Sequence, residues 1–204
     1  MTWCPYIVTV RRFPIVPIVL VLLIAGALAS PAGSSPRLPG LITDKGPWGP
    51  NDGPTLKPRL KAIGLHALPR EALTLHIHQR MAILVNGKPV YLPAGIGIDA
   101  HGKFISELHT HDYSGIIHVE SPVNRPFTLG EFFDVWGLRF SSHCLGGYCE
   151  TAMKHVFVWA NGKRVKKNIR NIVLSDHLSL VVAYGTLASV PKPIPPHFPF
   201  PKGY

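Results

Sequence analysis

Histidine is the residue type whose number and spacing most clearly indicate chemistry in this sequence. The chain contains 11 histidines, as many as its aspartates and glutamates together, and seven of them lie between His66 and His118. Two pairs have the spacing His-x-His, in the segments LHIHQ and LHTHD. Neutral imidazole is a ligand of zinc, copper, nickel and iron rather than of calcium or magnesium. The histidines therefore predict a transition-metal site.

The His-x-His spacing suits a β-strand. Residues i and i+2 of a strand point to the same face and lie about 6–7 Å apart, so each pair can present two imidazoles to one ion. If the two segments lie on neighbouring or facing strands, four imidazoles converge, and His118 is a fifth candidate. The predicted metal ligands are His76, His78, His109, His111 and His118.

Two carboxylates near these histidines are expected to orient them. Asp112 follows His111 directly, and Glu120 lies two residues after His118. A carboxylate that accepts the distal ring N–H of a metal ligand fixes the tautomer and direction of that ring. We therefore expect Asp112 and Glu120 to support the ligands from behind. The alternative is that the rings line a polar, metal-free face of a sheet.

The N-terminal segment has the order of residues that is typical of a secretory signal. Arg11 and Arg12 precede the apolar residues 13–29, which end in Ala-Leu-Ala. The apolar run is short for a bilayer span and contains two prolines. We predict a signal peptide at residues 1–29, with an uncleaved N-terminal membrane anchor as the alternative. The protein is then secreted or extracytoplasmic, or anchored to the membrane.

Export to an oxidising compartment affects the expected state of the cysteines and the expected identity of the metal. Cys144 and Cys149 are separated by Leu-Gly-Gly-Tyr, a flexible turn, and in an oxidising compartment we expect them to form a disulfide. Thiolate metal ligation and a redox-active dithiol are the alternatives. The same compartment favours copper(II) or zinc as the metal for imidazole ligands.

The charge of the chain indicates further partners. The net charge is +10, and it falls to +8 without residues 1–29, which contain two arginines and no acidic residue. A basic surface is attracted to anionic polymers, so we expect an anionic envelope surface or another envelope protein as a partner besides the metal ion. Nucleic acid is not expected, because the sequence has no nucleic-acid-binding motif.

Strand and turn signals begin at Leu73. Asn86-Gly87 and Asn161-Gly162 each join two strand-like runs, and Asn-Gly favours a hairpin because both residues tolerate positive φ. The segments FISELHTHD and GIIHVE predict a further strand pair that is broken near Gly115. Residues 172–185 predict two more strands that meet near Ser175-Asp176.

One short helix is predicted between the strand pair near Gly115 and the hairpin at Asn161-Gly162. Thr128 has the position of an N-cap, Glu131 can bond back to it, and Phe127 can pack on Phe132, while Gly137 provides a left-handed stop. The fold class is therefore α+β and predominantly β, with antiparallel hairpins and one capped helix packed on the sheet. This order is β-grasp-like, and a β-sandwich or barrel is the alternative.

The composition also divides the chain into segments. Residues 30–70 are rich in Pro, Gly and Ser, which is typical of a linker or a wrapping arm. Residues 71–188 form the expected histidine-rich β domain. Residues 189–204 are a Pro-rich C-terminal tail of polyproline character.

Four segments of the chain resemble a set found together in uncharacterised exported proteins of bacteria and archaea. They are HIHxxxxILVNGKPVYLPAGIGI, LHTHDYSGIIHVESP, FTLGEFFDVWG and CLGGYC, and the resemblance covers about residues 73–185. It implies a coherent exported domain. It implies nothing about mechanism, because that family has no established activity.

Together these patterns favour a non-catalytic, extracytoplasmic module that captures or delivers copper or zinc. Four histidine ligands would close the coordination sphere, so we do not expect an enzyme. One alternative is a metal-dependent enzyme, in which three histidines leave a position open for water or dioxygen. The other is a metal-free envelope adhesion or assembly module that uses hairpin edges and a basic surface.

Overall fold

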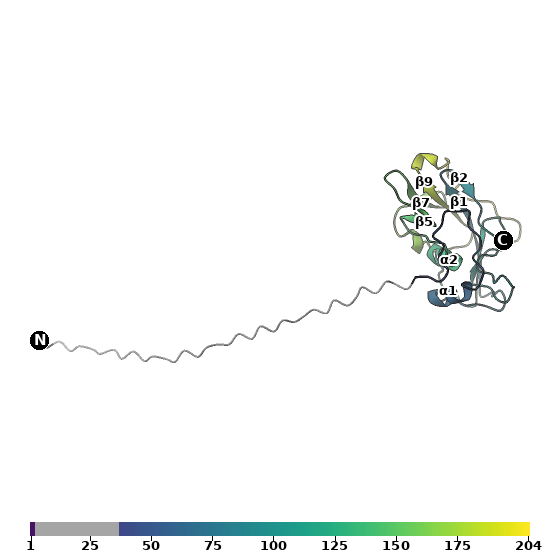
Figure 1. Cartoon of the computed structure of the whole chain (residues 1–204), viewed down its shortest axis with the longest axis horizontal. Helices are drawn as coiled ribbons and strands as arrows, with labels where there is room; N and C mark the ends of the chain where they lie inside the picture. Colours follow the sequence, from purple (N-terminus) through teal and green to yellow (C-terminus); the bar gives the residue numbers. More distant parts are fainter. Residues whose placement is uncertain (3–36) are drawn as a thin grey trace. The chain divides into compact units, whose positions relative to one another are not determined.

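The computed structural model of the chain describes residues 1–2 and 37–204 (Figure 1). The predicted signal peptide or anchor, apart from its first two residues, lies outside the described residues. The beginning of the expected arm, residues 30–36, also lies outside them. Within the described part, none of the helices has the length and apolar content that a bilayer span requires.

A seven-stranded sheet organises the domain, in the order β3-β4-β1-β9-β7-β8, with β2 as a further partner of β1. The central strands β1 and β9 are parallel, and the other pairs in the sheet are antiparallel. The strands are β1 (Leu75–Val85), β2 (Lys88–Val90), β3 (Leu108–His109), β4 (Ile116–Ser121), β7 (His155–Ala160), β8 (Lys163–Val165) and β9 (Leu178–Gly185). A parallel central pair with antiparallel partners on both sides is the β-grasp-like arrangement.

Short turns set the register of the hairpins, as predicted. Asn86 and Gly87 join β1 to β2, and Asn161 and Gly162 join β7 to β8; all four residues have positive φ. A separate two-stranded hairpin consists of β5 (Cys144–Leu145) and β6 (Tyr148–Cys149), and the expected disulfide joins its two cysteines.

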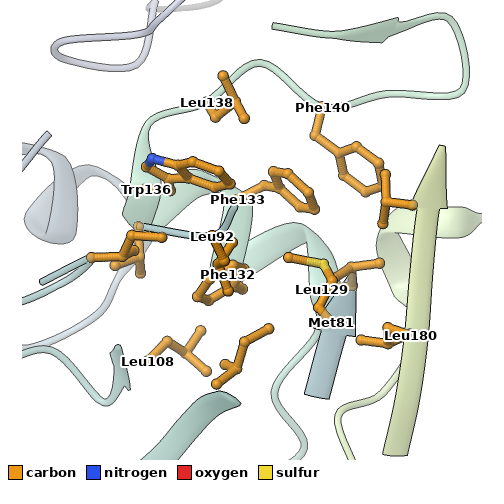
Figure 2. Packing of buried hydrophobic residues seen from close by; sticks show 14 of the residues in the cluster. Met81, Leu92, Leu108, Leu129, Phe132, Phe133, Trp136, Leu138, Phe140 and Leu180 are labelled. Atoms are coloured by element: carbon orange, nitrogen blue, oxygen red, sulfur yellow. The ribbon is translucent and has the colours of Figure 1, made fainter. Parts of the chain in front are cut away.

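Helix α2 (Leu129–Trp136) packs on one face of the sheet. Its capping box is complete, because Thr128 Oγ1 accepts from the Glu131 N–H and the Glu131 carboxylate accepts from the Thr128 N–H. Figure 2 shows how its aromatic residues fill the core. Phe133 stacks on Phe140, with the ring centroids 4.0 Å apart. Strands β1, β3 and β9 contribute Met81, Leu108 and Leu180 to the same core. The predicted α+β, predominantly β class is confirmed.

A second helix lies in the segment that the sequence indicated to be a linker or arm. Helix α1 (Leu56–Ile63) packs beside α2 (Figure 1) and buries Leu56 and Leu60 in the main core. The fully buried Arg59 donates to the carbonyl oxygen of Val135, and burial lowers the pKa of its guanidinium to about 10. Residues 37–70 are therefore built into the domain.

The structure also differs from the sequence prediction in residues 172–185. Two strands were expected there, and only β9 belongs to the sheet. The preceding segment forms a 3₁₀ turn, η1 (Ile169–Asn171), and then runs along the beginning of α2. There Val173 bridges to Thr128, and the Leu174 N–H donates to the Phe127 carbonyl oxygen. The start of α2 thus takes the backbone bonds that a sheet strand needs.

The sheet face opposite α2 is divided into two halves. One half is apolar. The Pro-rich tail, which follows the turn η2 (Leu187–Ser189), covers it, because Val190, Ile194 and Phe198 pack in one cluster with Trp159. The other half presents the even-numbered residues of the first part of β1, His76 and His78. The tail and the histidines therefore share one face of the sheet.

Candidate metal centre

Strand register brings the predicted histidines together on this face. Strand β4 lies between β1 and β3, and His118 of β4 is the register partner of His78 on one side and of His109 on the other. His78, His118 and His109 thus form a row across the three strands. Next to this row, His76 of β1 is the register partner of Glu120 of β4. Because residues two apart in a strand share a face, the side chains project in one direction from three adjacent strands.

The imidazoles are close enough to act as joint ligands. His76 Nε2 lies 3.1 Å from His78 Nε2, and His109 Nε2 lies 3.2 Å from His111 Nε2. The His118 ring is between the pairs, with centroid distances of 4.7 Å to His78 and 4.5 Å to His111. All five predicted ligands therefore gather in one cluster.

The cluster consists of two overlapping ligand groups. In each group, one possible ligand atom from every residue lies within 4.8 Å of the others, so either group could hold a metal ion. The first group is His76, His78, His118 and Glu120, and the second is His109, His111, His118 and Glu120. We call these six residues the histidine centre.

This division differs from the single four-histidine site that the sequence suggested. That site required the two His-x-His strands to be neighbours or to face each other. Strand β4 separates them instead, and adjacent strands lie about 4.8 Å apart. The two pairs are thus spaced by one strand, and His118 and Glu120 of that strand belong to both groups.

Glu120 is more deeply involved than predicted. Its side chain is only 3% exposed, and Oε1 lies 3.1 Å from His118 Nδ1 and 3.3 Å from His76 Nε2. It was expected to support a ligand from behind, and it does contact a distal ring nitrogen of His118. Its oxygen also lies among the possible ligand atoms of both groups. Its other oxygen, Oε2, is buried and has no hydrogen-bond partner within the described part of the chain.

Electrostatics keep this carboxylate ionised. Burial raises the pKa of Glu120, but the hydrogen bond from His118 and the neighbouring histidines outweigh burial, so that its pKa lies below the ordinary value. A buried ionised oxygen without a partner is costly. A cation bound to the Glu120 carboxylate would offset part of that cost.

Two of the imidazoles are held neutral by burial. Desolvation lowers the pKa of His78 to about 4, helped by the charges of His118 and His76, and lowers that of His109 to about 3. The neutral His109 ring can donate its Nδ1–H to the Ser106 carbonyl oxygen, at 3.0 Å. This bond leaves the lone pair of Nε2 free and directed toward His111, as metal ligation requires.

Asp112 lies apart from the imidazole nitrogens. Its carboxylate accepts from the Ser114 N–H at 2.8 Å in the turn before β4, and the hydrogen bonds from Ser114 lower its pKa. It belongs to neither ligand group. The structure therefore gives Asp112 a role in the turn, because the chain reverses direction immediately after His111.

Two residues near the centre were not predicted. Glu71 Oε1 lies 3.3 Å from His111 Nε2, and the ring of Tyr204 in the tail lies 4.8 Å from that of His78. Glu71 could have been suspected because it is acidic and close in sequence to His76. The sequence has no local signal for Tyr204, since only the path of the tail across the sheet brings it there.

Four histidines outside the centre lie near other carboxylates, and one of them is His177, whose Nε2 is 3.9 Å from Asp176 Oδ2. His66 contacts Glu107, whereas His143 and His155 both contact Glu150 near the disulfide hairpin. Hydrogen bonds from His143 and His155 lower the pKa of Glu150. Within the described residues, neither Glu107 nor Glu150 belongs to a group that could hold a metal ion.

The centre is open to solvent at two ends. The side chains of His76 and His111 are 41% and 40% exposed, whereas that of His109 is fully buried. An ion can therefore reach the outer rings from solvent and then contact the buried ligands.

Comparisons of the chain with models of protein families, with curated proteins and with solved structures found no match.

Proposed function

We propose that this protein is an extracytoplasmic metal-binding module that captures or delivers zinc or copper(II) through the histidine centre. The observation that carries the proposal is the distance between the Nε2 atoms within each pair, 3.1 Å and 3.2 Å. Two ligands of a tetrahedral ion with bonds of 2.0–2.1 Å lie about 3.3 Å apart. The pairs thus have nearly the spacing that joint ligation needs.

A metal explains the centre better than a polar, metal-free face does. Hydrogen bonds alone leave Glu120 Oε2 without a partner among the described residues. A polar group buried without a partner destabilises the fold. A bound cation would satisfy both the carboxylate and the imidazole lone pairs.

The donor atoms support zinc or copper(II) over other ions. In the part of the chain that the structure describes, both groups contain imidazole nitrogens and a carboxylate, and neither contains sulfur. Calcium and magnesium prefer oxygen ligands, and copper(I) prefers sulfur. The disulfide at Cys144 and Cys149 is consistent with the oxidising compartment that the N-terminal sequence predicts.

Capture or delivery is supported by the exposure of the outer ligands. An ion held between a half-exposed ring and buried rings can enter and leave without unfolding of the strands. Each ligand group contains four residues, enough to fill the coordination sphere of a tetrahedral ion, and a filled sphere disfavours catalysis.

The test is a zinc and copper(II) titration of the full chain after removal of metal with a chelator, by calorimetry and elemental analysis. We expect binding to weaken in the double variant His109→Ala, His111→Ala. The matched control is His143→Ala, His155→Ala, which removes two exposed histidines outside the centre. Equal binding by the wild type and the first variant, or loss only in the control, would contradict the proposal.

One observation favours metal-dependent catalysis as a second function. A cavity of about 540 Å³ lies beside His111 of the second ligand group and is also lined by Glu71, Leu73 and Phe104 among others. A substrate there would lie beside an ion held by His109 and His111. In cobalt(II)-loaded protein, azide should change the visible spectrum if a coordination position is open, and leave it unchanged if the protein ligands fill the sphere.

A further inference from the structure

The number of donor atoms in the histidine centre exceeds what one ion needs. A four-coordinate zinc or copper ion uses four ligands, and the centre offers five imidazoles and a carboxylate with two oxygens. A single ion in either group would leave the other His-x-His pair unused. The Nε2 atoms of that pair, 3.1 Å or 3.2 Å apart, would then be joined only by a hydrogen bond between the two rings.

Sheet geometry also separates the donors into two sets. His76 and His78 extend from β1, whereas His109 and His111 extend from β3 and the residues just after it, with β4 between them. Among the described residues, no group of possible ligands unites the two pairs. Each pair is therefore placed to hold its own ion.

Glu120 occupies the position of a bridge between these ions. Its Oε1 lies 3.3 Å from His76 Nε2 in the first pair and 3.9 Å from His109 Nε2 in the second. Its Oε2 is buried and lacks a hydrogen-bond partner within the described part. Because Oε1 lies near a nitrogen of each pair, the Glu120 carboxylate is placed to contact an ion at either pair.

We infer that the histidine centre binds two metal ions, one at His76 and His78 and one at His109 and His111, bridged by the carboxylate of Glu120. This inference rests on the proposed function. His118, which belongs to both groups, completes the coordination of the ion at His76 and His78. Glu71, 3.3 Å from His111, supplies a second carboxylate to the other. Two negative charges thus balance part of the charge of two divalent cations.

The experiment is native mass spectrometry of the full chain titrated with zinc. We expect two ions per chain for the wild type, and one ion each for His76→Ala and His111→Ala. Both substitutions affect half-exposed side chains, so they should leave the fold intact, which circular dichroism checks. The control variant His143→Ala, His155→Ala should still bind two ions.

The outcomes separate this inference from the proposed function. One ion in the wild type, or loss of the second ion in the control variant, overturns the two-ion centre and leaves metal binding in place. The absence of zinc and copper binding overturns both. As an independent measurement, copper(II)-loaded wild type should give a weaker electron paramagnetic resonance signal per ion than His111→Ala, because bridged copper(II) ions couple magnetically. Equal signals per ion contradict the bridge.

Discussion

His78 of β1 and His118 of β4 are register partners, and their ring centroids lie 4.7 Å apart with the ring planes perpendicular. On its other side, the ring of His118 stacks on that of His109, and their centroids lie 5.1 Å apart. One cross-strand row therefore carries three imidazoles, and the strand in its middle also contributes Glu120. The proposed metal chemistry depends on this row, so that its members are the first residues to test.

The first prediction concerns the buried carboxylate. Glu120→Gln keeps the shape of the side chain but removes its charge, and it should lower zinc affinity by at least about tenfold, since even residues that only support a metal ligand contribute 10–100-fold. Calorimetric titration measures the change. The control is Glu150→Gln, because Glu150 also lies between two histidines, His143 and His155, but outside the centre. Equal losses in both variants would contradict a special role of Glu120.

The second prediction concerns the stability of the metal-free protein as a function of pH. The pKa values of His78 and His109 are lowered to about 4 and about 3 by burial. Between these values and the unfolded value of about 6.5, the unfolded chain binds more protons than the folded chain. The free energy of unfolding should therefore fall as the pH decreases below about 6.5, by up to about 1.4 kcal/mol per pH unit for each histidine.

Urea denaturation at pH 7, 6 and 5 in the presence of a chelator measures this dependence. His109→Asn removes one of the two titrating groups and should make the slope shallower. A slope that is the same in the variant and the wild type would show that His109 is not held neutral by the fold.

The third prediction concerns the tail. The ring of Tyr204 lies against His78, at 4.8 Å, and the tail is held to the sheet by a hydrogen bond from Arg80 to the Pro199 carbonyl oxygen. Tyr204→Ala should speed the removal of bound zinc by a chelator several-fold, because it uncovers the first ligand pair. Phe200→Ala is the matched control, since Phe200 stacks on His177 instead. An unchanged rate for Tyr204→Ala would exclude a shielding role.

The fourth prediction separates the scaffold from the centre. Thr128→Ala removes the cap of α2 and should cost about 1 kcal/mol of unfolding free energy, whereas Thr128→Ser retains the hydroxyl and most of the stability. Zinc affinity should be unchanged in both, because α2 packs on the opposite face of the sheet. Chemical denaturation and calorimetry check the two parts, and a loss of affinity in Thr128→Ala would link the cap to the metal.

The features that could be predicted from the sequence are those determined by local interactions. Asn86-Gly87 forms a hairpin because both residues accept positive φ, and Thr128 with Glu131 begins a helix because their side chains satisfy nearby backbone N–H groups. The same holds for each His-x-His pair, whose shared face follows from the geometry of a single strand. These predictions needed no knowledge of distant contacts.

The features that were missed depend on contacts between distant parts of the chain. The His-x-His spacing does not show that β4 enters between β1 and β3, and so it does not show that Glu120 joins both ligand groups. Helix α1 has only eight residues, with a proline in its first turn, and it depends on packing against the core. The segment around Val173 has the composition of a strand, but the start of α2 takes its backbone bonds.

The central claim is tested most directly by the ¹⁵N signals of the histidine side chains in the full chain during a zinc titration. The account predicts that the signals of the five histidines of the centre shift and become slow to exchange. Those of His101 and His197, which belong to neither group, should stay in place. Zinc-dependent shifts confined to His143 and His155, or no shifts at all, would contradict the claim that the histidine centre binds metal.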